Sequence, residues 1–242
     1  AARGALRAMP GLVSVFTTER AYPLVASQLA QPMVHPWTPD TRLPKLCSAI
    51  LFGPGLAGPD VPPAMVQTAV RLWSESPLPV IADASALDWL PAGLPAAPGV
   101  RVITPHPGEA GRLLGLTTAS VQADRRGALR ALTKGWGNIW VVLKGRHTLI
   151  GSSCGDIWVN SSGNPGLGQG GSGDVLAGFL GGWLAQSSRL GDVGLAIRYA
   201  VWEHGNAADA LSVQRPVWEM GELLGLLGSS RGAGGRVGGP LP

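Results

Sequence analysis

The chain has 242 residues, of which 45% are hydrophobic and 14% are charged, and its formal net charge is +4. This composition is too apolar for a disordered chain, and the length suits one α/β domain with a sizeable core. Basic residues are scattered, and the one cluster (Arg125, Arg126 and Arg130) is interpreted as a solvated helix face. We therefore expect no nucleic-acid binding.

Only two cysteines occur, Cys47 and Cys154, and their spacing fits neither a disulfide framework nor a metal site. A reducing compartment, the cytoplasm, is therefore expected. The longest apolar run, 175–185, is too short to span a bilayer, and no signal peptide is visible. Because the chain starts Ala1-Ala2-Arg3 without Met, we expect that residues precede Ala1.

The predicted elements alternate between strands and helices. In chain order they are the end of a helix at 1–8, strand 12–16, helix 22–31, a proline-rich loop at 32–45, strand 48–52, a helix from about 62, strand 79–83, helix 85–90, strand 100–103, helices 108–114 and 120–134, strand 139–143, a hairpin of 147–151 with 156–160, and helices 172–186, 192–211 and 217–227. Most strands are continuous apolar runs, as in a parallel sheet covered on both faces. We expect one domain over 1–227 and a mobile Gly-rich tail over 228–242.

Polar residues and glycines follow several of the predicted strands. Ligands of parallel α/β sheets bind beyond the carboxyl ends of the strands, so these residues are candidates for one site. Each also has a structural interpretation: a tight turn, a helix cap, a surface histidine or a solvated lysine. His204 and Asp209, on a predicted helix, are interpreted as structural. The candidates are Gly53, Gly55, Asp83, His106, Glu109 and Lys144.

The stretch from Asn164 to Asp174 is rich in glycine and runs directly into an apolar helix. Glycines allow backbone N–H groups to approach a ligand closely, and a helix start adds unpaired N–H groups and partial positive charge. The segment Gly170-Gly171-Ser172-Gly173 therefore suits a phosphate or another anion. Asp174 would repel that anion, which favours a role as a base beside it, although a helix cap is the alternative.

Three motifs in this order resemble those of the NAD(P)H-hydrate dehydratases of the ribokinase-like superfamily. The motifs are Thr104-Pro105-His106-Pro107-Gly108-Glu109, Val142-Leu143-Lys144-Gly145, and Gly163-Asn164-Pro165-Gly166 with Gly170-Gly171-Ser172-Gly173-Asp174. Gly53-Pro54-Gly55 and His204-Gly205 also fall in matching order, and the resemblance extends from residue 1 to about 227. It implies a three-layer ribokinase-like fold with a mostly parallel central sheet and helices on both faces.

The resemblance also implies an enzyme that repairs damaged cofactor. Such enzymes use ADP or ATP to remove water from the S epimer of hydrated NADH or NADPH, and with ADP the other products are AMP and phosphate. Mg²⁺ would accompany the nucleotide, organised indirectly by Glu109. The other roles implied are a general base (Asp174), adenine-nucleotide binding (Lys144, Gly145, Arg146, His147, Thr148, Gly170, Gly171, Ser172, Gly173) and substrate binding (Gly53, Gly55, His106, Asn164, Asp174).

The sequence departs from the family pattern in three places. An opening strand with Gly-Gly-Ser and Gly-Ala-Pro stretches is absent, Ser85 stands where Asp is frequent, and Gly168-Gln169 replaces Ala-Thr. Two alternatives therefore stay open: a superfamily kinase for a small alcohol such as a vitamin precursor, and an inactive nucleotide-binding relic. The family leads us to expect a homo-oligomer. Whether an epimerase domain or partner lies upstream of residue 1 stays open.

Overall fold

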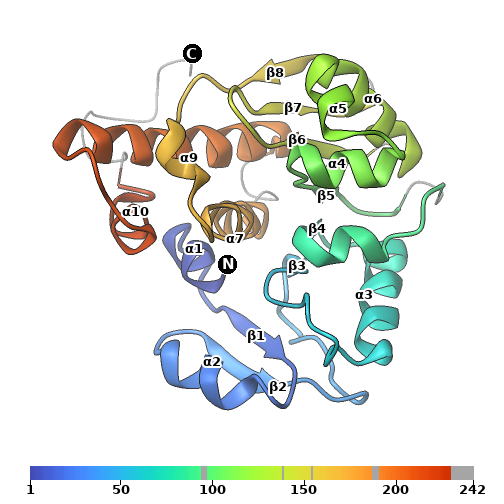
Figure 1. Ribbon diagram of the computed structural model, residues 1–242. Helices are drawn as coiled ribbons and strands as arrows, with labels where there is room; N and C mark the ends of the chain where they lie inside the picture. The colour runs from blue at the N-terminus through green and yellow to red at the C-terminus, as the bar shows by residue number, and fades with distance from the viewer. Residues whose placement is uncertain (94–96, 138, 154, 187–190, 230–242) are drawn as a thin grey trace.

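The computed structural model describes all residues except 94–96, 138, 154, 187–190 and 230–242 (Figure 1). Cys154 and residues 230–242 of the expected tail thus lie outside the described residues. The central sheet has the order β3-β4-β5-β6-β7-β8, with the bounds Ile50–Phe52, Val80–Ala82, Arg101–Ile103, Trp140–Leu143, Leu149–Gly151 and Ile157–Val159. Strands β3 to β6 are parallel, and β7 and β8 add antiparallel. The predicted mostly parallel sheet and its terminal hairpin are confirmed.

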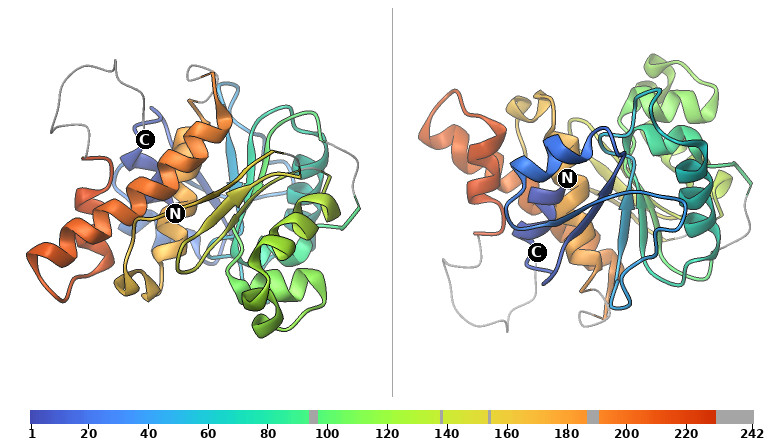
Figure 2. Two further views of the ribbon diagram at one scale, coloured as in Figure 1. Left: turned by 90° about the horizontal axis from the view of Figure 1, so that it is seen from above. Right: turned by 90° about the horizontal axis from the view of Figure 1, so that it is seen from below.

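Helices cover both faces of this sheet (Figure 2). One face carries α3 (Pro63–Glu75), the 3-10 helix η1 (Ala84–Trp89), α4 (Pro107–Leu114), α5 (Thr118–Ala123) and α6 (Arg125–Gly135). The other carries α1 (Ala2–Arg7), α7 (Ser172–Leu184) and α9 (Val193–Gln214), with α10 (Met220–Leu226) packed against α9. Within the described part of the chain, no helix is both long and apolar enough to cross a membrane.

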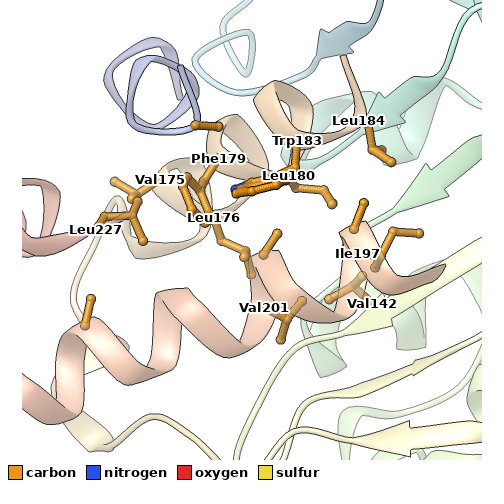
Figure 3. Packing of buried hydrophobic residues seen from close by; sticks show 14 of the residues in the cluster. Val142, Val175, Leu176, Phe179, Leu180, Trp183, Leu184, Ile197, Val201 and Leu227 are labelled. Carbon is orange, nitrogen blue, oxygen red and sulfur yellow. The ribbon is translucent and has the colours of Figure 1, made fainter. Parts of the chain in front are cut away.

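Successive strand residues point to opposite faces and supply two apolar cores. In β4, Val80 and Ala82 are buried in the core beneath α3 and α6, whereas Ile81 is buried in the core beneath α7 and α9. Figure 3 shows the second core, where Val142 of β6 lies close to Ile197 of α9. Because α7 is apolar around most of its circumference, this core holds the helix from several sides and fixes where its N-terminus lies.

Glycines allow α1 to lie directly against α7. A Cβ added at Gly178 would lie 1.9 Å from the Ala1 carbonyl oxygen, and one at Gly182 would lie 2.7 Å from that of Ala5. From the other helix, a Cβ at Gly4 would lie 2.3 Å from the Val175 carbonyl oxygen. The two backbones are therefore in contact along their length, so α7 is located by α1 as well as by the sheet.

The first two strands differ from the expectation. β1 (Ser14–Thr17) pairs in parallel with β2 (Met33–Pro36) in a separate two-stranded sheet, connected through α2 (Tyr22–Gln28). The prediction of a loop over 32–45 was wrong for residues 33–36. Its four prolines argued against a strand, but Pro36 is the last residue of β2, where a missing N–H is tolerated.

Arg101, the first residue of β5, is almost fully buried at the N-terminal end of its strand. Its guanidinium donates to the carbonyl oxygens of Trp73 and Ser76 at the end of α3, and to that of Leu78 at 3.0 Å. Burial lowers its pKa to about 10. The last carbonyls of a helix have no partner within the helix, so Arg101 supplies both hydrogen bonds and positive charge where α3 ends.

Replacement of Gly182 by Ala should destabilise the protein by about 1–3 kcal/mol, because the new methyl group would overlap the backbone of α1. The neighbouring Gly181→Ala is the matched control, since a Cβ there would lie 3.8 Å from Cβ of Leu51 on β3 and from Cδ1 of Ile81 on β4. In a helix interior that change should be neutral or stabilising by up to about 1 kcal/mol. Denaturant unfolding of both variants measures the difference, and equal stabilities would contradict this packing.

Candidate active site

Charged side chains from three neighbouring strand ends meet at the carboxyl edge of the sheet. The Nζ atom of Lys144, after β6, lies 2.9 Å from Oδ1 of Asp83, after β4. It also lies 3.8 Å from Oε2 of Glu109, in the helix that follows β5. The Asp83 side chain is only 1% exposed and also accepts a hydrogen bond from Thr104 Oγ1 at 2.7 Å. The sequence placed these residues at one edge, but the ion pair between Lys144 and Asp83 was not foreseen.

Gly53 allows β3 to approach this cluster. A Cβ there would lie 1.8 Å from the Asp83 carbonyl oxygen, and its φ of +118° disfavours any other residue. Ser85, at the position where the family often has Asp, donates to the Gly53 carbonyl oxygen at 2.9 Å. Gly55 is exposed and has open space around it. The Gly53–Gly55 turn is therefore fixed at its first residue and accessible at its last.

His106 and Glu109 cap the N-terminus of α4 together. His106 Nδ1 accepts from the backbone N–H of Gly108 at 3.0 Å and of Glu109 at 3.2 Å, and Glu109 Oε2 accepts from the His106 N–H at 2.7 Å. This reciprocal arrangement fixes the imidazole, whose side chain remains 53% exposed. The structure therefore gives both residues a capping role and leaves the imidazole accessible at the site.

The N-terminus of α7 faces the same cluster. Gly171 precedes the helix with φ of +87°, and Gly170 and Gly171 are both exposed. A Cβ at Gly173 would lie 3.2 Å from Lys144 Nζ, so the ammonium group lies beside the first helical turn. The free N–H groups expected in that turn and the lysine thus present positive charge from two directions.

Asp174 stands in that first turn and is half-buried. Among the described residues, nothing donates a hydrogen bond to its carboxylate, and it is not the cap of α7. The alternative interpretation of Asp174 as a side-chain cap is therefore not what the structure has. Asp174 also interacts electrostatically with the amino group of Ala1. A carboxylate that accepts no hydrogen bond from its surroundings is chemically able to accept a proton.

The side chain of Asn164 is used within its own loop. Its Oδ1 accepts from the Gly166 N–H at 2.9 Å, and its Nδ2 donates to Asp209 at 2.9 Å. Asp209 also accepts from the Gly163 N–H at 2.7 Å, in agreement with its predicted structural role. Asn164 thereby shapes the turn over 165–168, and both of its polar side-chain atoms already have partners.

The loop Lys144–Thr148 is predicted to bind nucleotide. Its shape depends on Arg125, which was interpreted from the sequence as part of a solvated helix face. Arg125 donates to the carbonyl oxygens of Leu143, Lys144, Arg146 and His147. Arg130 similarly binds the carbonyl oxygens of Ser152 and Gly155. The interpretation of the arginine cluster as a solvated face was therefore wrong for both residues, and holds only for the exposed Arg126.

One signal in the sequence could have identified Arg125. The expected helix 120–134 is divided at Asp124, whose side chain caps α6 by accepting from the Gly127 N–H at 2.8 Å. Arg125 is therefore the first residue of α6, where a positive charge opposes the helix dipole. An arginine at that position contributes little to the helix itself, which points to a contact elsewhere.

His204 of α9 lies behind the α7 turn. Burial lowers its pKa to about 4, a hydrogen bond with the Ser172 backbone opposes this shift, and the positive charge of Lys144 adds to it. Its Nε2 atom is buried without a hydrogen-bond partner among the described residues. The imidazole is therefore neutral near neutral pH and supports the start of α7.

The chain has a ribokinase-like fold. A ribokinase-like superfamily protein from Enterococcus faecalis V583 shares the fold, with a TM-score of 0.72, 24% identity, and coverage of 94% of this chain and 79% of that one. A family model described as NAD(P)H-hydrate dehydratase matches residues 1–224. The chain therefore belongs to the NAD(P)H-hydrate dehydratase family.

Individual relatives agree with this assignment. The bifunctional NAD(P)H-hydrate repair enzyme Nnr of Coxiella burnetii is 36% identical over 212 residues, which cover 86% of this chain and 42% of the relative. The chain thus spans less than half the length of the first curated relatives it matches. The ADP/ATP-dependent NAD(P)H-hydrate dehydratase from Bacillus subtilis, co-crystallised with ATP/Mg²⁺ and soaked with CoA, has a TM-score of 0.78, 30% identity, and coverage of 94% of this chain and 84% of that one.

The stability of the protein should fall as the pH drops below the unfolded-state pKa of His204. The folded-state pKa is about 4 and the ordinary value is 6.5, so the unfolded chain takes up a proton first. Between about pH 7.5 and about pH 5 this group should account for about 2 kcal/mol of lost stability. Denaturant unfolding of the wild type, His204→Gln and the exposed control His35→Gln measures it. An equal loss in all three proteins would refute the assignment.

Proposed function

We propose that this chain dehydrates the S epimer of hydrated NADH or NADPH, with ADP as the phosphoryl donor, to give NAD(P)H, AMP and phosphate. The observation that carries the proposal is the meeting of Lys144 with the first turn of α7 at the sheet edge, with Asp174 in the same turn. Family membership supports these substrates, as does the similarity to the ADP/ATP-dependent NAD(P)H-hydrate dehydratase from Bacillus subtilis.

Phosphoryl transfer depends chiefly on positioning and charge neutralisation. The hydroxyl oxygen on the hydrated nicotinamide ring attacks the terminal phosphorus of ADP, and AMP leaves. Asp174 takes the proton of that hydroxyl group. Loss of the resulting phosphate with a ring proton restores the double bond of the reduced nicotinamide. The amides of Gly170 to Gly173 hold the transferring group, and Lys144 provides a cation with three donors.

The remaining roles are assigned from the family resemblance and are part of this proposal. The loop Lys144–Thr148 binds the adenine nucleotide together with the α7 turn. Gly53, Gly55 and His106 border the space for the hydrated dinucleotide beside Asp174. Asn164 contributes through the turn it shapes, because its side-chain atoms are already bonded.

The donor set fits a magnesium ion that arrives with the nucleotide. Mg²⁺ is usually held by substrate phosphates, waters and only one or two carboxylates. Among the described residues, no group of three or more His, Cys, Asp or Glu side chains could hold a metal ion. Glu109 and Asp83 would hold the water shell of that ion. The ion would neutralise phosphate charge. Supply of the S epimer by an epimerase is in keeping with the bifunctional name of the Coxiella relative.

The direct test is incubation of the protein with S-hydrated NADH and either ADP or ATP. Recovery of NADH absorbance together with AMP release is expected with ADP. A stable phosphorylated product would indicate the kinase alternative, and nucleotide binding without turnover would indicate the relic.

Replacement of Asp174 by Asn should lower kcat by about 10²- to 10⁴-fold, because the general base is lost, while ADP affinity is kept. The matched control is Glu222→Gln, which removes a carboxylate from the same position of the first turn of α10 and should keep turnover. Steady-state kinetics with calorimetric ADP titration tests both. Near-normal kcat in Asp174→Asn would exclude this residue as the base.

A further inference from the structure

Arg125 holds the backbone of the nucleotide loop in one shape. Its Nη1 donates to the carbonyl oxygens of Arg146 and His147, the latter at 3.2 Å. Its Nη2 donates to those of Leu143 and Lys144, at 3.0 and 3.3 Å. A guanidinium has its donors in a rigid planar fork, so these four bonds can form together only when the loop has a defined conformation.

The loop needs such support because His147 is a non-glycine residue with a positive φ. Gly145 has φ of +134° and His147 has φ of +55°, a region that costs a non-glycine residue about 1–2 kcal/mol. Such conformations persist when the surroundings determine them. A Cβ at Gly145 would lie 3.3 Å from Arg125 Nη2 and 3.9 Å from Cγ of Pro107. The loop is thus packed between the guanidinium and the start of α4.

The charge of Arg125 is directed at the loop as well. Within the described ranges, no carboxylate forms an ion pair with it, and its partners are carbonyl oxygens alone. The next residue, Arg126, is exposed and carries the same charge one position along the chain.

We propose that Arg125 is a positioning residue for adenine-nucleotide binding, which sets the conformation of Lys144–Thr148 without contacting the reacting atoms. This inference rests on the proposed function of the loop. It predicts that the fork geometry matters and that a positive charge alone is insufficient.

The test compares Arg125→Lys, Arg125→Gln and the control Arg126→Gln with the wild type. Calorimetric ADP titration gives Kd, and steady-state kinetics gives kcat and the KM of each substrate. We expect Kd and KM for ADP to rise about tenfold in both Arg125 variants, as for the loss of a hydrogen bond to a charged group. The kcat value and the KM for hydrated NADH should stay within about twofold, and Arg126→Gln should match the wild type.

A second variant tests the loop from the other side. Gly145→Ala leaves Arg125 intact but adds a methyl group against its Nη2 at an unfavourable φ, so it should show the same selective loss of ADP affinity. Full ADP affinity in Arg125→Lys would show that charge alone suffices and would overturn the proposal. An equal loss for both substrates would show general damage and would also overturn it. Wild-type protein that binds ADP without converting hydrated NADH would count against the proposed function, while the Kd values would still decide the role of Arg125.

Discussion

The contact between Lys144 and Asp83 is the interaction on which the candidate site depends. A carboxylate as buried as that of Asp83 is costly without a partner, and Lys144 at 2.9 Å and Thr104 at 2.7 Å supply two. These bonds join the ends of β4, β5 and β6. They also hold the ammonium group where it meets the first turn of α7, so that the sheet edge and the helix form one charged surface.

The opposite wall of the site is positioned by close packing. The α7 helix lies against the backbone of α1 through Gly178 and Gly182, and a Cβ at Gly205 of α9 would lie 2.3 Å from Oγ of Ser162. Tightly packed backbones cannot slide past one another without a clash, so the position of the Gly-rich turn relative to the sheet is fixed. The Lys144–Asp83 pair thus fixes the strand ends, and backbone contacts fix α7. Together they set where the first turn of α7 lies relative to the sheet edge.

The sequence was sufficient for features that depend on local pattern. Apolar runs located every strand of the central sheet, and the Gly-rich stretch located the start of α7. The sequence was insufficient for contacts between segments that are distant along the chain. Asp83 and Lys144 are 61 positions apart, and their pairing depends on a strand order that hydropathy does not contain. The role of Arg125 was missed for the same reason, since its partners are carbonyl oxygens, which no residue type marks. The strand at 33–36 was missed because proline content outweighed the apolar residues between the prolines.

The charge balance of the site constrains the role of Lys144, which is already paired with Asp83. Three carboxylates, those of Asp83, Glu109 and Asp174, lie near the ammonium group of Lys144 and the N-terminus of α7. The amino group of Ala1 also interacts electrostatically with Asp83 and Asp174. Under the proposed function, a nucleoside diphosphate would add further negative charge beside these three carboxylates. Lys144 cannot neutralise both, because moving it fully to the phosphates would leave the buried Asp83 unpaired. Under the proposed function, this balance suits a nucleotide that brings its own divalent counter-ion, with Lys144 shared between Asp83 and the phosphate.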